Sequence, residues 1–406
     1  MHSDLRSRLF SWIILLAPAT ALTTPDGMGA IEIFLLLASA LSARSLAAQR
    51  RLWLPQTRWI ILAFVLHAAL AVASVYWQGG RSAHIDNPLR QALMLGAIGL
   101  VALARPRRDW FWYGVFIGAS GAFGIALYQR FILLWDRAGG FHQIIMFGDI
   151  AMTLALLSLA ALPRFAGSRL AALPYAGFLC GVGASLLSVT RGGWVVLVLA
   201  FIPLLAQDRR HAAPRLLAVA GGGAVLLLGA YLIPATGVAV RVAEITRDLQ
   251  LYAQGTIYTP IGTRLEMWRA ALMMFLEHPL AGVGRANFNA GMLDLIQRGV
   301  ISPNVAEYQH GHNELLHALA TQGLPGALAL LLMYAAPLAF FLRQLRRRDD
   351  SQPYALAGLL LVLAFVGFGL TQMLFSHHIG AAFYAVLVTI LAGLCLSVPA
   401  RSATVA

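Results

Sequence analysis

The stretch from Thr263 to Gly326 is TRLEMWRAALMMFLEHPLAGVGRANFNAGMLDLIQRGVISPNVAEYQHGHNELLHALATQGLPG. It lies in the only long segment between hydrophobic runs, and it contains the turn Gly282-Val283-Gly284-Arg285 and the sequence His310-Gly311-His312-Asn313-Glu314. The rest of the chain consists mainly of apolar runs joined by short connections. We therefore expect a membrane scaffold that presents one polar region.

The composition predicts a membrane protein. Of 406 residues, 59% are hydrophobic and 12% are charged, and the mean hydropathy is +0.73; soluble domains carry about 25% charged residues. Runs of about 20 apolar residues are long enough to cross a bilayer as helices, and continuous runs exclude the alternating strands of a β-barrel. We expect twelve such helices, at about 9–23, 28–48, 58–77, 88–104, 110–129, 146–163, 170–188, 192–207, 214–234, 324–343, 354–374 and 379–398.

This pattern divides the chain into three parts. Residues 1–234 hold spans 1–9, residues 235–323 form a polar region, and residues 324–406 hold spans 10–12 and a tail. The fold class that we predict is an all-α polytopic membrane protein with a helical loop domain between spans 9 and 10. The two cysteines, Cys180 and Cys395, lie inside apolar runs, so no disulfide framework is expected.

The charge distribution predicts the orientation. The net charge is +13, all 30 basic residues are arginines, and most of them flank one set of connections. Because basic residues accumulate on the cytoplasmic side, both termini should be cytoplasmic and residues 235–323 should face outward. A basic pI can indicate a nucleic-acid partner, but here the accumulation of arginines on the cytoplasmic side is a sufficient explanation.

The polar region has the periodicity of helices. Apolar residues recur at helical spacing in four short segments. These begin at Val238, at Arg264 with Thr263 as N-cap, at Phe288, and at His312, the last being closed by Gly323-Leu-Pro-Gly326.

Two arginines are candidate phosphate ligands. Arg191 lies between two spans that have almost no loop, where a planar guanidinium suits a phosphate; the alternative is that it reaches to lipid headgroups. Arg264 follows the expected cap Thr263, and a helix N-terminus favours anions. Its alternative role is an ion pair with a nearby glutamate.

His312 is the candidate general base, because a neutral histidine near pH 7 can accept a proton. The alternative is a histidine on a helix surface. His310 and Glu314 have metal-ligand spacing, but no third ligand is evident, so we expect no metal. The chain has no GxxxxGK[ST] loop and no outward Asp-x-Asp pair. We therefore expect an anionic substrate that arrives already activated, such as a lipid-linked pyrophosphate, and no cofactor.

In three motifs the chain resembles bacterial O-antigen ligases and the wider ligase/polymerase superfamily. The resemblance is carried by His312-Asn313 followed after nine residues by Gly323-x-x-Gly326, by Arg264-Leu-Glu-Met-Trp268 with His278-Pro-Leu-Ala-Gly-Val-Gly284, and by Ser188-Val-Thr-Arg191-Gly192. It implies a GT-C-like fold and an inverting, metal-independent glycosyl transfer. In that reaction O-antigen moves from undecaprenyl pyrophosphate to a sugar of lipid A–core, at the periplasmic side of the bacterial inner membrane.

The resemblance also implies roles for single residues. His312 would be the base, and Arg191 and Arg264 would hold the pyrophosphate. Further candidates for substrate contact are Arg137, Trp268, Arg285, Tyr308, His310 and Asn313.

Other functions stay open. An O-antigen polymerase or a pilin-glycosylating ligase would share the motifs, and a transporter or flippase for a lipid-linked sugar would share the twelve spans. The distribution of ionisable residues argues against a carrier. They gather in the outer region, whereas a carrier holds its charges near the midplane of the membrane. We interpret Glu32 and His67, which lie within predicted spans, as satisfied interior groups.

Overall fold

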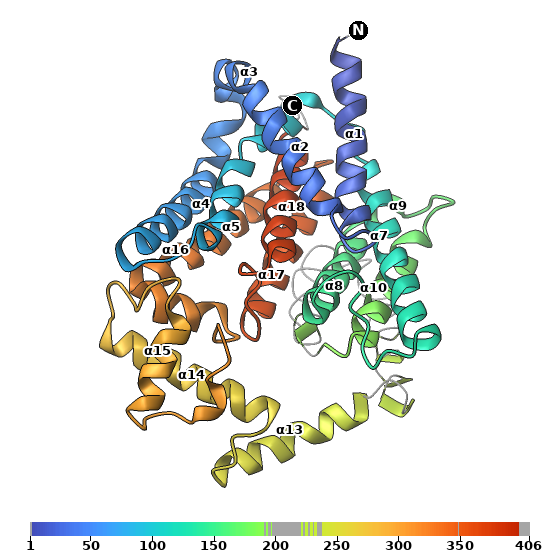
Figure 1. Cartoon of the computed structure of the whole chain (residues 1–406). Helices are drawn as coiled ribbons and strands as arrows, with labels where there is room; N and C mark the ends of the chain where they lie inside the picture. Colours follow the sequence, from blue (N-terminus) through green and yellow to red (C-terminus); the bar gives the residue numbers. More distant parts are fainter. Residues whose placement is uncertain are drawn as a thin grey trace.

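The computed structural model describes residues 2–190, 192, 193, 196, 221, 224, 225, 228, 229, 231–233, 238–347 and 349–397. Within these residues the chain is helical and has no strand, which confirms the all-α prediction (Figure 1). The first group of elements is α1 (His2–Thr20), α2 (Gly27–Leu41), α3 (Ala43–Ala48), α4 (Arg50–Gln78), α5 (Ala83–Met94), α6 (Ala97–Ala104), α7 (Trp110–Leu127), the π-helical turn η1 (Tyr128–Ile132), α8 (Ile144–Ala160), α9 (Leu162–Phe165) and α10 (Leu173–Leu187). The second group is α13 (Val238–Ala253), α14 (Pro260–Glu277), α15 (Phe288–Gln297), the 3₁₀ turn η3 (Pro303–Val305), α16 (Glu314–Leu345), α17 (Gln352–Gly369) and α18 (His378–Leu396).

The protein is a multi-pass membrane protein. In the described part of the chain, six segments are long and apolar enough to cross a membrane: Arg50–Gln78, Ala83–Ala104, Trp110–Ile132, Glu314–Leu345, Gln352–Gly369 and His378–Leu396. Helices α2, α8 and α10 are shorter apolar helices. Predicted spans 192–207 and 214–234 fall largely outside the described residues. The count of twelve and the GT-C likeness therefore stay predictions.

Small residues let the helices of the bundle approach closely. A Cβ added to Gly114 of α7 would lie 2.0 Å from the Leu15 carbonyl oxygen of α1, and one added to Gly118 would lie 2.2 Å from the Pro18 carbonyl oxygen. Without a hydrophobic driving force inside a bilayer, such close backbone packing is a main source of helix association. Glycine is therefore required at both positions.

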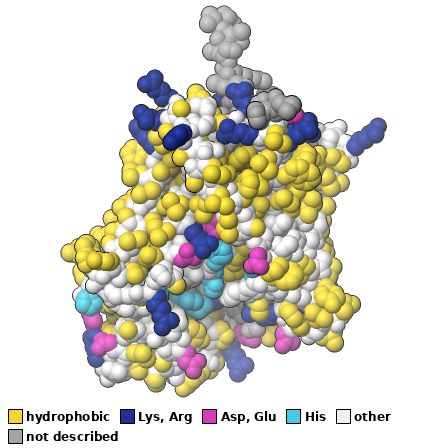
Figure 2. Space-filling view, turned by 45° about the horizontal axis from the view of Figure 1, so that its top comes forward, with side chains coloured by type: hydrophobic (Ala, Val, Ile, Leu, Met, Phe, Trp, Pro, Cys, Tyr) yellow, Lys and Arg dark blue, Asp and Glu magenta, His cyan; other side chains and the backbone are white. Residues whose placement is uncertain are grey.

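The bundle has two distinct ends. The start of α1 and the end of α18 lie at one end, and α13, α14 and α15 lie at the other (Figure 1). Figure 2 shows arginine side chains gathered at the first end and a hydrophobic belt next to it. On the same face, histidine and charged side chains interrupt the apolar surface near its middle. This belt suits a molecule embedded in lipid.

Three of the four helices expected in the polar region coincide with α13, α14 and α15, but the start of the second differs. The side chain of Thr259 caps α14 by accepting a hydrogen bond from Gly262 N at 3.0 Å, and Pro260 occupies the first helical position. The prediction that Thr263 is the N-cap is wrong by one turn, because a threonine directly before a proline is the stronger helix start. Arg264 consequently lies in the second turn of α14.

The fourth expected helix is continuous with a membrane span. Helix α16 begins at Glu314 and runs to Leu345, with an interruption at Gly323, whose φ of 63° and ψ of −160° are not helical. Such a φ favours glycine. A Cβ on Gly323 would also lie 2.6 Å from the backbone of Leu280.

The interruption in α16 lets two glycine motifs interlock. The freed carbonyls of Ala320 and Thr321 accept hydrogen bonds from Val283 N at 2.9 Å and Gly284 N at 3.0 Å. A Cβ on Gly282 would lie 2.3 Å from the carbonyl carbon of Thr321. The Gly282-Val-Gly284 turn is thus fixed against α16 through backbone contacts that admit no side chain.

Candidate functional site

The predicted base, His312, is held by a side chain from a different part of the chain. His312 Nδ1 lies 2.8 Å from Oε1 of Gln372, which is 1% exposed and lies between α17 and α18. A carbonyl oxygen only accepts, so with Oε1 of Gln372 turned toward the ring the proton is placed on Nδ1 and the Nε2 lone pair is available. His312 itself has a left-handed φ of 45°. Backbone strain of this kind is concentrated at functional positions.

The two residues after His312 bind the same loop, residues 370–375. Asn313 donates from Nδ2 to the Leu370 carbonyl at 3.1 Å, and its Oδ1 caps α16. Glu314 Oε2 accepts hydrogen bonds from the backbone N–H groups of Leu374 at 2.6 Å and of the next residue at 3.4 Å. Three consecutive side chains therefore fix this loop, which in turn fixes Gln372 against His312.

A cluster of aromatic and imidazole rings surrounds His312. The ring centroid of His310 lies 4.4 Å from that of His312, and the Tyr308 ring lies 6.0 Å from it. The ring of His377 lies 6.2 Å from that of His310. Within the described residues, His310 Nδ1 and His377 Nε2 are buried without hydrogen-bond partners. Buried polar atoms without partners are rare, so this cluster is suited to receive a polar group such as a sugar hydroxyl.

Burial lowers the pKa values of the histidines in this cluster below their ordinary value of 6.5, which favours the neutral imidazole at pH 7. Burial lowers the pKa of His310 to about 4, and the charges of the neighbouring His312 and His377 act in the same direction. Burial likewise lowers the pKa of His312, and the positive charge of Arg264 adds to that effect, while the hydrogen bond to Gln372 opposes it. A neutral imidazole with a free nitrogen has the protonation state that a general base requires.

A cavity of about 460 Å³ lies beside this cluster. Its lining combines basic, hydroxyl and apolar groups from six separate parts of the chain. The lining residues are Arg137, Ile145, Val189, Thr190, Gly192, Ile245, Pro260, Ile261, Arg264 and Thr371. Thr371 directly precedes Gln372, so the cavity and the predicted base share one loop.

The structure brings one predicted phosphate ligand, Arg264, and one further candidate for substrate contact, Arg137, to this cavity. Arg264 and Arg137 both line it, and Arg137 Nε donates to the Ser188 carbonyl at 3.0 Å. Arg191 lies outside the described residues, but its neighbours Thr190 and Gly192 line the cavity. Guanidinium groups beside an apolar wall suit a ligand that has an anionic head and a hydrocarbon tail.

The start of α14 offers the cavity fewer free donors than predicted. Gly262 N donates to Thr259 Oγ1, and Ile261 N donates to Asp248 Oδ2 at 3.4 Å. These N–H groups are already satisfied within the protein. Arg264 therefore contributes to anion binding through its side chain.

Other predicted site residues have structural partners. Arg285 is partly buried, its Nε donates to the His84 carbonyl at 2.8 Å, and its NH1 donates to Gln322 Oε1 at 3.0 Å. Removal of its guanidinium from water lowers its pKa to about 10. Asn313 uses both ends of its amide within the protein. Substrate contact by these two residues stays a prediction, and their contacts favour a structural role. Trp268 has a buried Nε1 with no partner among the described residues.

Four site residues were not among those predicted from sequence. Thr371 and Gln372 lie at the end of predicted span 354–374, and His377 lies just beyond it. Asp149, which is 2% exposed and lies next to the lining residue Gly192, falls inside predicted span 146–163. Each is a polar residue within or next to an apolar run, and this exception to the apolar pattern is the feature of the sequence that could have identified it.

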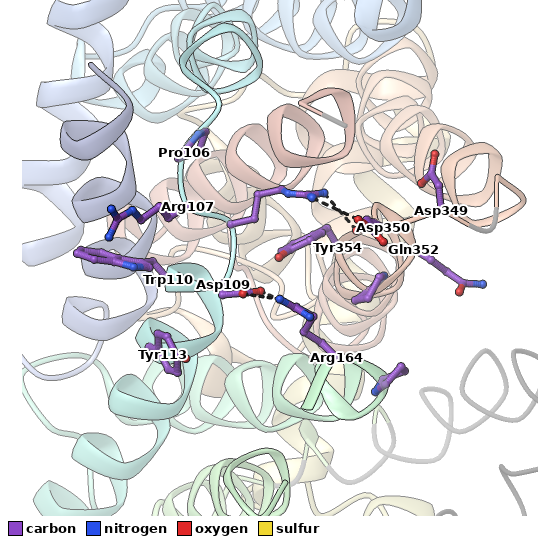
Figure 3. A pocket seen from close by; sticks show the side chains of 13 residues that line it. Pro106, Arg107, Asp109, Trp110, Tyr113, Arg164, Asp349, Asp350, Gln352 and Tyr354 are labelled. Atoms are coloured by element: carbon purple, nitrogen blue, oxygen red, sulfur yellow. Dashed lines mark hydrogen bonds and ion pairs between the residues drawn. The ribbon is translucent and has the colours of Figure 1, made fainter. Parts of the chain in front are cut away.

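A second concave surface has no part in this site. It lies between α7, α9 and α17, has a volume of about 740 Å³ and contains none of the predicted site residues (Figure 3). Most of its charged side chains form ion pairs: Arg164 binds both oxygens of Asp109 at 2.7 Å, and Arg108 lies 3.7 Å from Asp350. Paired charges leave little attraction for a ligand, so we interpret this pocket as a structural junction between helices.

The residues that the structure describes contain no evident metal site. Among those residues, no group of three His, Cys, Asp or Glu side chains converges as metal ligands would. The catalysis without metal that we expect therefore stays a prediction that needs a direct test.

Comparisons with known proteins point to one family. Residues 176–331 match the family model O-antigen ligase, a range that includes Arg191, Arg264 and His312. An uncharacterised protein of Haemophilus influenzae is 23% identical over 334 residues, which cover 80% of this chain and 83% of that protein. The O-antigen ligase of Escherichia coli is 27% identical over 136 residues, which cover 33% of this chain and 30% of the ligase. The resemblance to O-antigen ligases drawn from the sequence is thereby confirmed.

Proposed function

We propose that this protein, which matches the O-antigen ligase family over residues 176–331, is an O-antigen ligase of the bacterial inner membrane. It transfers O-antigen polysaccharide from undecaprenyl pyrophosphate to a sugar hydroxyl of lipid A–core, on the periplasmic side. One observation carries the proposal. A cavity lined by two arginines and by apolar side chains includes Thr371 in its lining, and the next residue, Gln372, is hydrogen-bonded to His312.

The donor fits this cavity by its chemistry. A polyprenyl pyrophosphate has an anionic head, which suits the guanidinium groups of Arg137 and Arg264. Its hydrocarbon chain suits the side chains of Ile145, Val189 and Ile245, which line the same space. The polysaccharide then extends toward the histidine cluster.

The reaction follows from the protonation state of His312. Nε2 of the neutral imidazole takes the proton from the acceptor hydroxyl, and the hydroxyl oxygen attacks C1 of the donor sugar from the side opposite the phosphate. The bond between C1 and the phosphate oxygen breaks, its electron pair stays with the pyrophosphate, and the configuration at C1 inverts. General-base assistance contributes about 10²–10⁴-fold.

The arginines act on the leaving group. Negative charge grows on the bridging phosphate oxygen as the C1–O bond breaks, and Arg264 together with Arg191 stabilises it. A well-placed donor of this kind contributes about 3–4 kcal/mol. The energy of the reaction comes from cleavage of the bond between C1 and the phosphate oxygen, whose leaving group is the intact pyrophosphate. This suits a site on the outer side of the membrane, where no ATP is available.

A deletion strain tests the proposal in cells. We expect loss of long-chain lipopolysaccharide while the lipid-linked polymer accumulates, and restoration by the wild-type chain. If the lipid-linked polymer instead stays one repeat long, the protein is a polymerase. If lipopolysaccharide is unchanged and a glycosylated pilin disappears, it is a pilin ligase.

A further inference from the structure

Asp149 is a buried acid for which the proposed mechanism has no role so far. It lies in the second turn of α8, is 2% exposed, and its Oδ1 is buried without a hydrogen-bond partner among the described residues. An ionised carboxylate in such surroundings costs several kcal/mol unless it is paired. An acid within an apolar helix is therefore a strong candidate for a functional group.

The carboxyl group of Asp149 lies next to Gly192, which lines the donor cavity. A Cβ added to Gly192 would lie 3.4 Å from Asp149 Oδ1 and 3.3 Å from Thr371 Oγ1. Gly192 and Thr371 both line the cavity, as does Ile145, which lies one turn before Asp149 on the same face of α8. A side chain larger than glycine at position 192 would fill the space next to both the acid and the hydroxyl group.

The groups that face Asp149 leave it without a close partner. From α14, the positive charge of Arg264 acts on Asp149, but no arginine of the described residues forms an ion pair with it. Ser188 and Thr190, which pack against Gly148 of α8, do not titrate, and neither does Thr371. Arg191 lies outside the described residues. The described surroundings thus provide no hydrogen-bond donor for an ionised Oδ1.

We propose that Asp149 is protonated when the donor is bound and donates a hydrogen bond from its carboxyl group to a phosphate oxygen of the donor pyrophosphate. This inference rests on the proposed function, since it needs a pyrophosphate in the cavity. A carboxylate that faces a phosphate would repel it, whereas a neutral acid in an apolar site supplies a hydrogen-bond donor.

The hydrogen bond also contributes to catalysis. A hydrogen bond to an anion is stronger than one to a neutral acceptor, so the contact strengthens as the leaving pyrophosphate gains charge. No proton is transferred. The proton of the acceptor hydroxyl still goes to His312, and Asp149 keeps its own.

Binding of farnesyl pyrophosphate to the purified full-length protein tests this role without any transfer reaction. Titrations between about pH 5.5 and 9 would compare the wild type with Asp149→Asn, Asp149→Ala and the control Asp86→Asn, which changes a half-exposed acid on α5. The Asn variant keeps a donor at the same place, so its affinity should stay within about threefold of the wild type. The Ala variant should bind about tenfold more weakly.

The pH dependence separates the proposal from a merely structural role. Relative to the Asn variant, which cannot ionise, the wild type should lose affinity at high pH, where Asp149 gives up its proton. If the Ala variant does not fold, the pH dependence of the wild type relative to the Asn variant is sufficient to test the proposal. Equal weakening by Asn and Ala would mean that the ionised carboxylate is needed, which overturns the proposal.

The same experiment distinguishes failure of the inference from failure of the proposed function. If the wild type and all variants bind equally at every pH, Asp149 has no role in donor binding and the proposed ligase function is untouched. If the wild type binds no farnesyl pyrophosphate at any pH, the proposed donor site itself is wrong. The control Asp86→Asn should match the wild type throughout.

Discussion

The imidazole of His312 and the amide of Gln372 are joined by a hydrogen bond of 2.8 Å, although the two residues are 60 positions apart in the chain. The bond fixes which nitrogen of the imidazole is free. Because a neutral amide rather than a carboxylate makes this contact, His312 is oriented without a large increase in its basicity.

Changing Gln372 should move the pH dependence of ligation. The base must be neutral, so activity is present above the pKa of His312 and is lost as the pH falls through it. Burial lowers this pKa below its ordinary value of 6.5, so the acid limb of the wild type should lie below pH 6.5. In Gln372→Glu a negative charge raises the pKa of His312, and the limb should move to higher pH.

A control variant separates charge from position. Gln372→Leu removes the acceptor without adding charge, so the maximal rate should fall because the tautomer and the ring orientation are no longer fixed. A pH–rate profile measured on purified protein distinguishes the two effects. An acid limb that is identical in the wild type and Gln372→Glu would show that Gln372 does not contact the base during catalysis.

Arg264 and Arg269 form a matched pair on α14. Arg264 lines the cavity, whereas Arg269 is 56% exposed and lies 3.8 Å from Glu266. Arg264→Ala should reduce ligation about 10²–10³-fold, since it removes a group that stabilises the leaving charge. Arg269→Ala should stay near wild-type activity. Equal losses in both variants, at equal protein levels, would contradict the placement of the donor.

The glycines of the interlocked motifs should be required for stability. Gly323 and Gly299 both have positive φ, 63° and 68°, but only Gly323 has backbone atoms within 4 Å of an added Cβ. Gly299→Ala therefore incurs only the cost of the unfavourable φ, about 1–2 kcal/mol. Gly323→Ala adds a clash with the backbone of Leu280, and its loss in thermal stability should be clearly larger. A similar loss in both would mean that the motifs do not interlock.

Glu314 should act through the loop that it binds. Its carboxylate accepts two backbone hydrogen bonds from residues 374 and 375. Glu314→Ala leaves these buried N–H groups without a partner, at about 1–3 kcal/mol. We expect lower thermal stability together with lower activity, and partial retention of both in Glu314→Gln, which keeps one acceptor oxygen. Unchanged activity in Glu314→Ala would show that this loop does not position Gln372.

Much of the fold was predictable from the sequence because its physical signals are local. Continuous apolar runs predicted the membrane helices, and the helical spacing of apolar residues that begins at Val238 predicted α13. The start of α14 was missed by one turn because the Thr259-Pro260 signal was passed over in favour of Thr263.

The arrangement of the site depends on contacts that are distant in sequence. Arg264 and His312 were identified by their chemistry and motifs, but nothing local shows that His312 contacts Gln372. Gln372 and Asp149 were not identified from the sequence because each lies in a run of residues with a high mean hydropathy. Arg285 had the chemistry of a phosphate ligand, yet its position among His84 and Gln322 depends on how α5 and α16 pack.

The catalytic role assigned to His312 also makes a prediction about metals. His312→Ala should lower transfer about 10²–10⁴-fold without loss of folded protein. Chelators should leave the wild type fully active, because the proposed mechanism takes its base from His312 and its charge stabilisation from arginines. Inhibition by EDTA that added divalent cation reverses would contradict this part of the account.

The most direct test uses purified protein in detergent with O-antigen linked to undecaprenyl pyrophosphate and with lipid A–core. The products would be separated and the polymer located by mass. We predict that the wild type attaches the polymer to lipid A–core and releases undecaprenyl pyrophosphate, and that His312→Ala does neither. Elongation of the lipid-linked polymer without attachment to lipid A–core, or absence of any covalent transfer, would contradict the ligase function.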